Sequence, residues 1–495
     1  MSGAELRPVA VLVDAYTTGN HLPVAFAKLG VDVVHVQSTP ELMTSMRLPE
    51  LSRYRAALPY GTPAETAERL AAYAPICVVA GQEPGVPLAD ELSERLGLPG
   101  NGTALSAARR DKYEMIEALR RAGVRCADQF KSGSADELVA WAERRADYPV
   151  VVKPLSSAAT EGVAVCSDAR EVREAAEAVL GTVNIFGERN DEVLVQSFLR
   201  GEEYMADFVS YDGERYACCV WQYHKRLVGT HRIYDRDSVL PPGAGPAPEI
   251  IAYLHEVHDA LGLAYGPTHA EVIVTPEGPV LVEIGARLSG GVVPDFHDRC
   301  LGGNQADLTA LAYARPEEFR ARHAGGTYRK LAEASMVLTS TTLDGVVEEL
   351  DERVVAEIRA LESVHTFVPK VAPGKRIRPT VDLYTATAAV HLVHDSAETL
   401  ARDYARIQEL KDRVYRLRDT GPTAGTEAEA SAPASAPAPA AASAPTTGTE
   451  AAASAPAVGI GTEASAPAAA SAPTTGTEAA ASAPAAASDA REVAA

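Results

Sequence analysis

The chain has 495 residues and a formal net charge of −21, which argues against nucleic acid or an anionic membrane as its main partner. It contains no apolar run of membrane-spanning length and no basic N-terminal region typical of a signal peptide. Its six cysteines lack the CxxC spacing of a metal site and are interpreted as reduced thiols. Together these features predict a soluble, cytoplasmic α/β protein.

The last part of the chain differs in composition from the rest. From about Thr420 it consists almost wholly of Ala, Ser, Pro, Thr, Gly and Glu, and the stretch at 440–457 recurs unchanged at 468–485. Such a segment cannot bury enough apolar surface to offset its ordering entropy. We therefore expect 420–495 to be a disordered tail. Its seven acids and one arginine leave a net charge of −15 on residues 1–419.

Strand-like and helical patterns alternate along the N-terminal part. In chain order they are strand Pro8–Val13, helix His21–Leu29, strand Val31–Val36, helix Pro63–Tyr73 and strand Ile76–Ala80. This order predicts an open, parallel, doubly wound domain over residues 1–105. The first turn, Asp14–Asn20, lacks a GxGxxG fingerprint, so a dehydrogenase built on this domain is disfavoured.

Mixed elements follow. Asp111 and Glu114 resemble a capping box that opens a helix, and Gly123 ends it. The next patterns predict strand Tyr148–Lys153, a loop of small residues at Ser156–Val163, strand Val193–Phe198, a hairpin of Glu203–Tyr211 and Arg215–Tyr223, and helix Pro248–Leu261. Beyond Gly325-Gly326 we expect a small α/β subdomain over 326–419, with strands Ala334–Thr339, Val381–Thr387 and Ala389–His394 and a terminal helix Ala397–Leu417.

A second predicted hairpin carries the most informative residues. Its two strands are Thr268–Thr275 and Gly278–Ile284, joined by the turn at 276–278. If Val274 pairs with Val280 across this turn, then Glu271 faces Glu283, with Cβ atoms about 4.5–5.5 Å apart. Two facing carboxylates repel unless a cation lies between them, and carboxylate oxygens are good ligands for Mg²⁺. Arg287 follows closely, and a divalent cation beside a fixed arginine can hold phosphate. The hairpin therefore predicts an enzyme that uses ATP, although Arg287 could instead pair with one of the carboxylates in a structural role.

Other residues suit a nucleotide site less specifically. Lys153 ends an apolar strand and Lys112 begins a helix; each could contact phosphate or be an ordinary partly exposed lysine. The segment Gln196–Leu199 could read an adenine edge and Glu203 could hold ribose hydroxyls, but a structural strand with an acidic turn explains both. By strand alternation Leu281 shares a face with Glu283, so it could floor an adenine pocket or belong to the core.

The candidates for substrate contacts are basic or aromatic, and Trp221, Tyr223, His224 and Arg226 could line the acceptor site. His224, Lys225 and Arg226 form a basic cluster in sequence, which could receive a substrate carboxylate or lie on an exposed strand edge. His269 is two residues before Glu271 and could contact substrate or orient a carboxylate.

Taken in order, four strings resemble the ATP-grasp superfamily of carboxylate–amine ligases, and most of all the L-amino acid ligases. They are DK at Asp111-Lys112, YPVVVKP at Tyr148–Pro154, VLVQSFLRGEEY at Val193–Tyr204 and THAEVIVTPEGPVLVEIGARLSGG at Thr268–Gly291. The resemblance implies a Rossmann-like N-terminal domain at 1–105, an ATP-grasp domain at 106–325 with a lid at about 125–198, and the C-terminal α/β subdomain at 326–419.

The resemblance also implies roles for single residues. Lys112 and Lys153, with Ser156 and Ser157 of the loop, would contact the ATP phosphates, and Glu271 and Glu283 would hold Mg²⁺, with Mn²⁺ as an alternative. Arg287 would be catalytic by stabilising the acyl phosphate and its tetrahedral adduct, and Lys153 by neutralising the charge that develops on the phosphate. The remaining nucleotide contacts would be Gln196, Ser197, Phe198, Leu199, Glu203 and Leu281. Gly285 replaces an Asn that many relatives use as a further ligand, and Ala158-Ala159 replace common loop glycines.

The expected reaction is ligation of a small-molecule carboxylate, an amino acid, to an amine, with ATP cleaved to ADP and phosphate. The oligomeric state stays open at this point, with a homodimer as one candidate because dimers are frequent among resembling enzymes. Two alternatives remain open at this point: an enzyme that activates bicarbonate, as carboxylases of this fold do, and a degenerate protein that binds nucleotide without catalysis.

Overall fold

The computed structural model describes residues 7–43, 46–156, 162–184, 187–228 and 231–418, without the side chains of 227–232. Ser157, Ala158-Ala159 and the predicted tail at 420–495 lie outside these residues. Within the described ranges, no helix is both long enough and apolar enough to cross a membrane. All six cysteines are described, and each is a free thiol.

The N-terminal part is a four-stranded parallel sheet in the order β3-β2-β1-β4. Its strands are β1 (Val9–Val13), β2 (Asp32–Val36), β3 (Ala56–Leu58) and β4 (Cys77–Ala80), and its helices are α1 (His21–Lys28), α2 (Pro63–Ala71) and α3 (Val86–Leu96). The predicted parallel, doubly wound arrangement is confirmed. The strand order reverses between β1 and β4, and in such sheets ligands bind beyond the carboxyl ends of the strands at this point.

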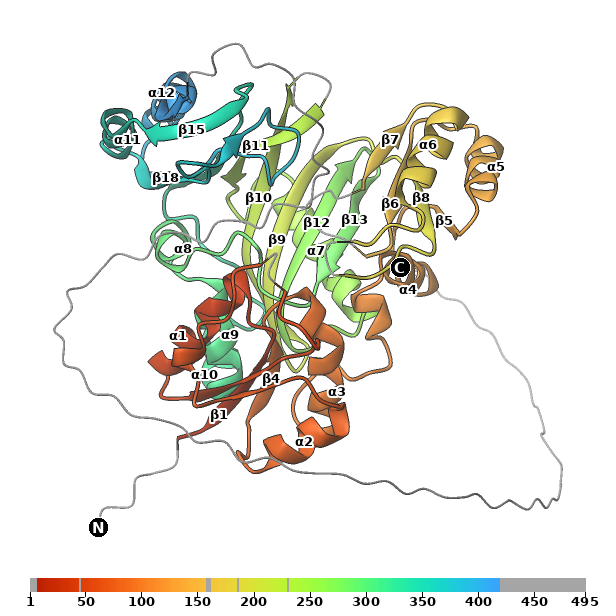
Figure 1. The fold of residues 1–495 in the computed structure, drawn as a ribbon. Coiled ribbons are helices and arrows are strands. Elements are labelled where there is room, and N and C mark those ends of the chain that lie inside the picture. The colour runs from red at the N-terminus through yellow and green to blue at the C-terminus, as the bar shows by residue number, and fades with distance from the viewer. Residues whose placement is uncertain (1–6, 44–45, 157–161, 185–186, 229–230, 419–495) are drawn as a thin grey trace, which may run out of the picture. The chain divides into compact units, whose positions relative to one another are not determined.

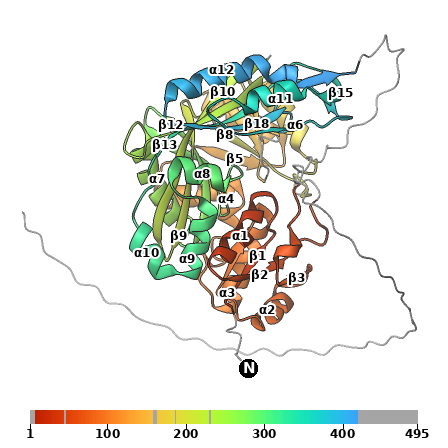
Figure 2. The same cartoon turned by 90° about the vertical axis from the view of Figure 1, so that its left-hand side faces the viewer.

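Both faces of this sheet are covered (Figure 1). Alternate valines of β1 and β2 pack on α2 and α3 in one apolar cluster. The opposite face packs on α1 and also on α9 (Gln305–Ala314), a helix far along the chain. Figure 2 shows α1 and α9 side by side. The N-terminal sheet thus shares its core with a segment that follows the hairpin carrying Glu271 and Glu283, called the acidic hairpin below.

A second, antiparallel sheet has the order β5-β8-β6-β7. It consists of β5 (Gln129–Ser132), β6 (Val150–Pro154), β7 (Ala164–Cys166) and β8 (Val193–Ser197). Helices α5 (Ala135–Arg145) and α6 (Ala169–Val179) cover one face through a single apolar cluster. Val150 and Val152 belong to that cluster, so alternation turns Lys153 to the opposite face.

The largest sheet has eight strands in the order β13-β12-β9-β10-β11-β14-β18-β16. Their bounds are β9 (Glu202–Tyr211), β10 (Glu214–Val228), β11 (His231–Val239), β12 (Gly266–Thr275), β13 (Gly278–Gly285), β14 (Glu333–Thr339), β16 (Val364–Pro369) and β18 (Ala388–His394). The two predicted hairpins are confirmed, with β10 longer than expected. Helices α4 (Lys112–Arg121) and α7 (Ala247–Ala260) contribute to its core. Asp111 caps α4 by accepting hydrogen bonds from the backbone of Tyr113 and Glu114.

The remaining α-helices and a small further sheet complete the described fold. They are α8 (Pro294–Leu301), α10 (Pro316–His323), α11 (Glu352–Arg359), α12 (Ala397–Leu410) and a small sheet of β15 (Gly345–Leu350), β17 (Arg376–Ile377) and β19 (Tyr415–Leu417). The predicted boundary at 325/326 does not interrupt hydrogen bonding, because β14 pairs with β11. The proposed division into domains stays a prediction.

Two C-terminal predictions are wrong. Residues 381–387 form no strand, because the Thr385 hydroxyl accepts hydrogen bonds from the backbone N–H groups of Val381 and Asp382, and the Asp382 carboxylate accepts from that of Thr385. Such local bonds favour a turn over a strand. The terminal helix stops at Leu410 because Tyr415–Leu417 pairs with β15 instead.

Candidate active site

The predicted pair of carboxylates is present on the hairpin of β12 and β13. Glu271 lies opposite Glu283, and their side chains are 20% and 28% exposed. The register behind this prediction is wrong, however, because Val274 pairs with Pro279 rather than Val280. A β-bulge at the extra residue Val282 restores the expected pairing beyond it.

The same bulge changes the prediction for Leu281. Leu281 pairs with Val272, the neighbour of Glu271 on β12, so it lies on the face opposite the two carboxylates. It is fully buried in the core of the large sheet. The alternation argument that placed it under an adenine is therefore wrong. Val280, which pairs with Ile273, shares the acidic face instead.

Two lysines meet this acidic face. Nζ of Lys112, at the start of α4, lies 2.7 Å from Glu283 Oε2. Burial raises the pKa of Glu283, but the charge and hydrogen bond of Lys112 outweigh this effect and hold the pKa well below its usual range. Glu283 is therefore ionised at neutral pH, as a metal ligand must be.

Lys153 projects from the face of the second sheet that its helices leave uncovered. Its Nζ donates to Gln196 Oε1 at 3.0 Å, and both side chains are buried. Burial and the nearby charge of Lys112 lower its pKa to about 8, against the opposing effects of Glu283 and Glu271. The strand end therefore holds a desolvated cation next to the acidic hairpin, which suits contact with phosphate.

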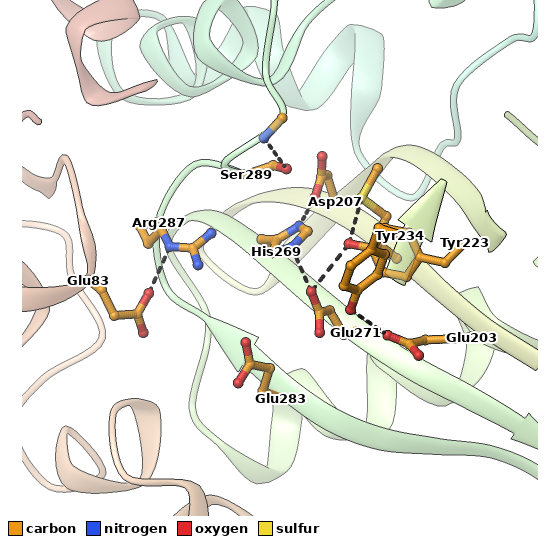
Figure 3. A network of polar contacts seen from close by, with 12 residues as sticks. Glu83, Glu203, Asp207, Tyr223, Tyr234, His269, Glu271, Glu283, Arg287 and Ser289 are labelled. Carbon is orange, nitrogen blue, oxygen red and sulfur yellow. Dashed lines mark hydrogen bonds and ion pairs between the residues drawn. The ribbon is translucent and has the colours of Figure 1, made fainter. Parts of the chain in front are cut away.

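Arg287 follows β13 and is held by an acid from the N-terminal sheet. Its Nε lies 2.7 Å from Glu83 Oε2, and its Nη1 donates to the carbonyl of Leu288 at 2.9 Å. Burial lowers the pKa of Arg287, but Glu83, Glu283 and Glu271 raise it overall. Figure 3 shows the guanidinium between Glu83 and the side chains of β12.

His269 belongs to the same network (Figure 3). Its Nδ1 lies 2.7 Å from Asp207 Oδ1, and its Nε2 lies 3.7 Å from Glu271 Oε1. Burial lowers its pKa, but Asp207 and Glu271 raise it to about 9 overall, so the ring is cationic at neutral pH. Glu271 also accepts a hydrogen bond from the Tyr223 hydroxyl at 3.2 Å. This arrangement favours orientation of a carboxylate as the role of His269.

The basic cluster of β10 is divided between the two faces of the sheet. Lys225 forms an ion pair with Glu203, the predicted ribose contact, which also accepts from Tyr234 at 3.0 Å. His224 instead contacts Ser238, and Arg226 contacts Asp235 and Ser340 on the opposite face. Grouping His224 and Arg226 as a substrate site is therefore wrong, because strand alternation turns both away from Glu271. Trp221 is fully buried and stacks on Phe296.

The other predicted nucleotide contacts lie at or next to the strand ends of the second sheet. Ser197 accepts a hydrogen bond from the backbone of Asp128, Phe198 lies under the Arg200 guanidinium, and Leu199 is half-buried. The carbonyl of Ser156 accepts from Asn184. Their roles in binding adenine and phosphate stay predictions.

Several residues of this network were not anticipated, namely Glu83, Asp207, Tyr234 and Asp237. Burial raises the pKa of Asp237, and the charges of Glu271 and Glu203 raise it further, so the protonated form of Asp237 is favoured beside these two carboxylates. Glu83 carried a sequence signal, because it follows a parallel strand by three residues and so lies at the carboxyl edge of the sheet.

The donor set fits a hard divalent cation. Among the described residues, no group of three or more Asp, Glu, His or Cys side chains is arranged to hold a metal. Mg²⁺ nevertheless commonly binds through one or two carboxylates and takes its other ligands from phosphate and water. Glu271 and Glu283 supply such a pair of oxygen donors.

Comparison with known proteins agrees with this geometry. The family described as ATP-grasp domain matches residues 146–295. Dapdiamide A synthase of Enterobacter agglomerans is 34% identical over 425 residues, which cover 84% of this chain and 99% of the relative. Alanine–anticapsin ligase of Bacillus subtilis (strain 168) is 26% identical over 222 residues, covering 41% and 46% of the two chains.

The fold has solved counterparts as well. The crystal structure of an L-amino acid ligase from Bacillus licheniformis superposes with a TM-score of 0.65 at 18% identity, covering 84% of this chain and 100% of that one. At this identity the likeness concerns the fold alone, whereas the match over nearly the whole of dapdiamide A synthase establishes the family. This chain is thus a member of the ATP-grasp carboxylate–amine ligases, an ATP-dependent enzyme that forms amide bonds.

Proposed function

We propose that the enzyme joins the carboxylate of an amino acid to an amine through an acyl phosphate and releases ADP and phosphate. The observation that carries this proposal is the facing pair Glu271 and Glu283, with Lys112, Lys153 and Arg287 around it. The name of one relative, alanine–anticapsin ligase, supports the substrate class.

Each residue has a role in this scheme. Glu271 and Glu283 would hold Mg²⁺, or Mn²⁺ in its place, and the ion would neutralise charge on the phosphates. Lys112 and Lys153 would bind the phosphate oxygens while the substrate carboxylate attacks the γ-phosphorus and ADP leaves. The amine would then attack the acyl carbon, lose a proton and expel phosphate, while Arg287 stabilises the negative oxygens of the adduct.

Further parts of the proposal concern the nucleotide and the setting of the enzyme. Gln196, Ser197, Phe198 and Leu199 would contact adenine and Glu203 ribose, and Ser156 and Ser157 would contribute to the phosphate loop. Unpaired thiols support a reducing compartment such as the cytoplasm. We also propose a homodimer, which analytical ultracentrifugation of the full chain tests.

A screen for ADP release tests the proposed reaction. Purified enzyme, ATP and Mg²⁺ are incubated with amino acids singly and in pairs, and hydroxylamine is added in parallel to trap an activated carboxyl group as a hydroxamate. We expect ADP release that requires an amino acid and a hydroxamate of the same amino acid. Release that depends on bicarbonate alone would identify a carboxylating enzyme, and no release with any substrate would contradict the proposal.

A further inference from the structure

A carboxylate from the N-terminal sheet reaches the arginine of the candidate active site. Glu83 begins a short 3-10 helix directly after β4, and its Oε2 lies 2.7 Å from Nε of Arg287. The two residues are 204 positions apart in sequence, and each side chain is only 15% exposed. The contact therefore joins the carboxyl edge of the parallel sheet to the end of the acidic hairpin.

The glycine at 285 leaves the room that this contact needs. A Cβ atom added at Gly285 would lie 2.9 Å from Glu83 Oε2 and 3.3 Å from Cζ and Nε of Arg287. Real side chains essentially never approach so closely to a carboxylate oxygen, so one of the two groups would have to move. The flexible end of Glu83 is the group that can give way.

Two of the three guanidinium nitrogens are fixed by the protein. Nε is bound to Glu83 and Nη1 donates to Leu288 O. Within the described part of the chain, Nη2 donates to no protein acceptor. Because the guanidinium is planar, two anchors fix its orientation, and the remaining nitrogen is available to a negatively charged group beside Glu271 and Glu283.

We propose that Glu83 is a positioning residue for Arg287, and that Gly285 is required because a larger residue would displace the Glu83 carboxylate. The inference rests on the proposed function, in which Arg287 acts on the phosphoryl oxygens and the adduct. Glu83 itself touches neither substrate nor nucleotide in this account. It fixes the orientation of the Arg287 guanidinium. This orientation matters because a small misplacement of a catalytic group lowers the reaction rate strongly.

Kinetics of Glu83 variants test the positioning role. In Glu83→Ala, kcat and kcat/KM should fall together by about 100-fold while KM for ATP stays unchanged. Glu83→Gln keeps the length and an oxygen acceptor for Nε and should retain an intermediate activity. Glu91→Gln is the matched control, since it makes the same charge change at an exposed ion pair with Arg95 on the following helix, and it should behave as wild type.

A double-mutant cycle distinguishes positioning of Arg287 from a role of Glu83 in stability alone. Gly285→Ala should fold and lose about as much activity as Glu83→Ala, and the double variant should be no worse than either, because both changes remove the same contact. Additive losses, or full activity of Gly285→Ala, would overturn the inference. So would variants whose unfolding temperature drops while kcat per folded enzyme stays at the wild-type value.

Assays of the wild-type enzyme distinguish failure of the proposed function from failure of the positioning role of Glu83. If wild type releases no ADP with any substrate pair, the proposed function fails, and the inference built on it fails too. If wild type is active and Glu83→Ala matches it, only the inference fails.

Discussion

At the scale of single residues, charge pairing decides what each group of the site can do. Glu283 is ionised because Lys112 lies against it, and Lys153 loses basicity because burial and Lys112 act in the same direction. The lysines and carboxylates therefore hold each other in a compact set of charges. Bound ATP and a divalent cation would exchange these pairs for phosphate and metal contacts.

Removing one carboxylate tests the metal assignment. Glu283→Gln keeps the size of the side chain but removes a negative oxygen donor, so we expect kcat for ADP release to fall about 100-fold or more. The exposed Glu277→Gln, at the turn of the same hairpin, should be neutral. Steady-state ADP release with saturating Mg²⁺ measures both variants, and equal activities would contradict the assignment.

The depressed pKa of Lys153 predicts a pH effect on nucleotide affinity. The charged lysine binds phosphate, and above a pKa of about 8 the free enzyme increasingly holds it neutral. The dissociation constant of ATP should therefore rise with pH above about 8, by up to about tenfold per unit. Calorimetric titration between about pH 7.5 and 9.5 at constant ionic strength checks this. His269, with a pKa of about 9, titrates in the same range, so the profile is compared with that of an enzyme that lacks the lysine.

A variant without the lysine serves as the control for that titration. Lys153→Met should bind ATP more weakly at every pH and show a flatter profile. A wild-type profile as flat as that of Lys153→Met would refute the role of Lys153.

At the scale of elements, the register of the strands determined which positions of the site residues could be predicted from the sequence. Glu271 pairs with Glu283 as predicted, but only because a β-bulge offsets the error in the predicted turn register, in which Val274 was paired with Val280 instead of Pro279. The bulge at Val282 was not predictable, because a valine fits an ordinary strand equally well. It reversed the face assigned to Leu281, and alternation likewise separated Lys225 from His224 and Arg226.

The turn between the predicted adenine segment and β9 provides a prediction at this scale. A Cβ atom at Gly201 would lie 2.0 Å from the carbonyl oxygen of Val274, which no L side chain can tolerate. Gly201→Ala should therefore lower the free energy of unfolding by about 1–3 kcal/mol and weaken ATP binding, since the turn connects Gln196–Leu199 to Glu203.

The control for this substitution is Gly243→Ala, because nothing lies within 4 Å of a Cβ at that position. Urea unfolding and ATP titration of both variants check the prediction. Equal stabilities would show that the close approach of Gly201 to β12 is not a constraint.

At the scale of the whole described molecule, contacts between distant segments were the least predictable. The parallel N-terminal sheet followed from its alternating patterns, but the packing of α9 on that sheet did not. The ion pair of Glu83 and Arg287 spans 204 positions, and no local periodicity indicates such a partner. The large sheet also continues across the predicted boundary at 325/326, where β11 pairs with β14. This pairing was not predictable because it joins strands that are distant in sequence.

These long-range contacts bring together the groups on which the proposed chemistry depends. The hairpin supplies Glu271 and Glu283, the second sheet supplies Lys153, and the N-terminal sheet supplies Glu83 to hold Arg287. Each arises from a different sheet, so the site exists only in the folded whole.

Transfer of ¹⁸O from the carboxylate substrate to phosphate tests most directly whether the reaction proceeds through an acyl phosphate. With the carboxylate substrate labelled with ¹⁸O and paired with its amine, attack on the γ-phosphorus followed by expulsion of phosphate moves one labelled oxygen into the released phosphate. We predict singly labelled phosphate from each turnover by mass spectrometry, and its loss in Glu283→Gln. Unlabelled phosphate, or label found in AMP, would contradict the account.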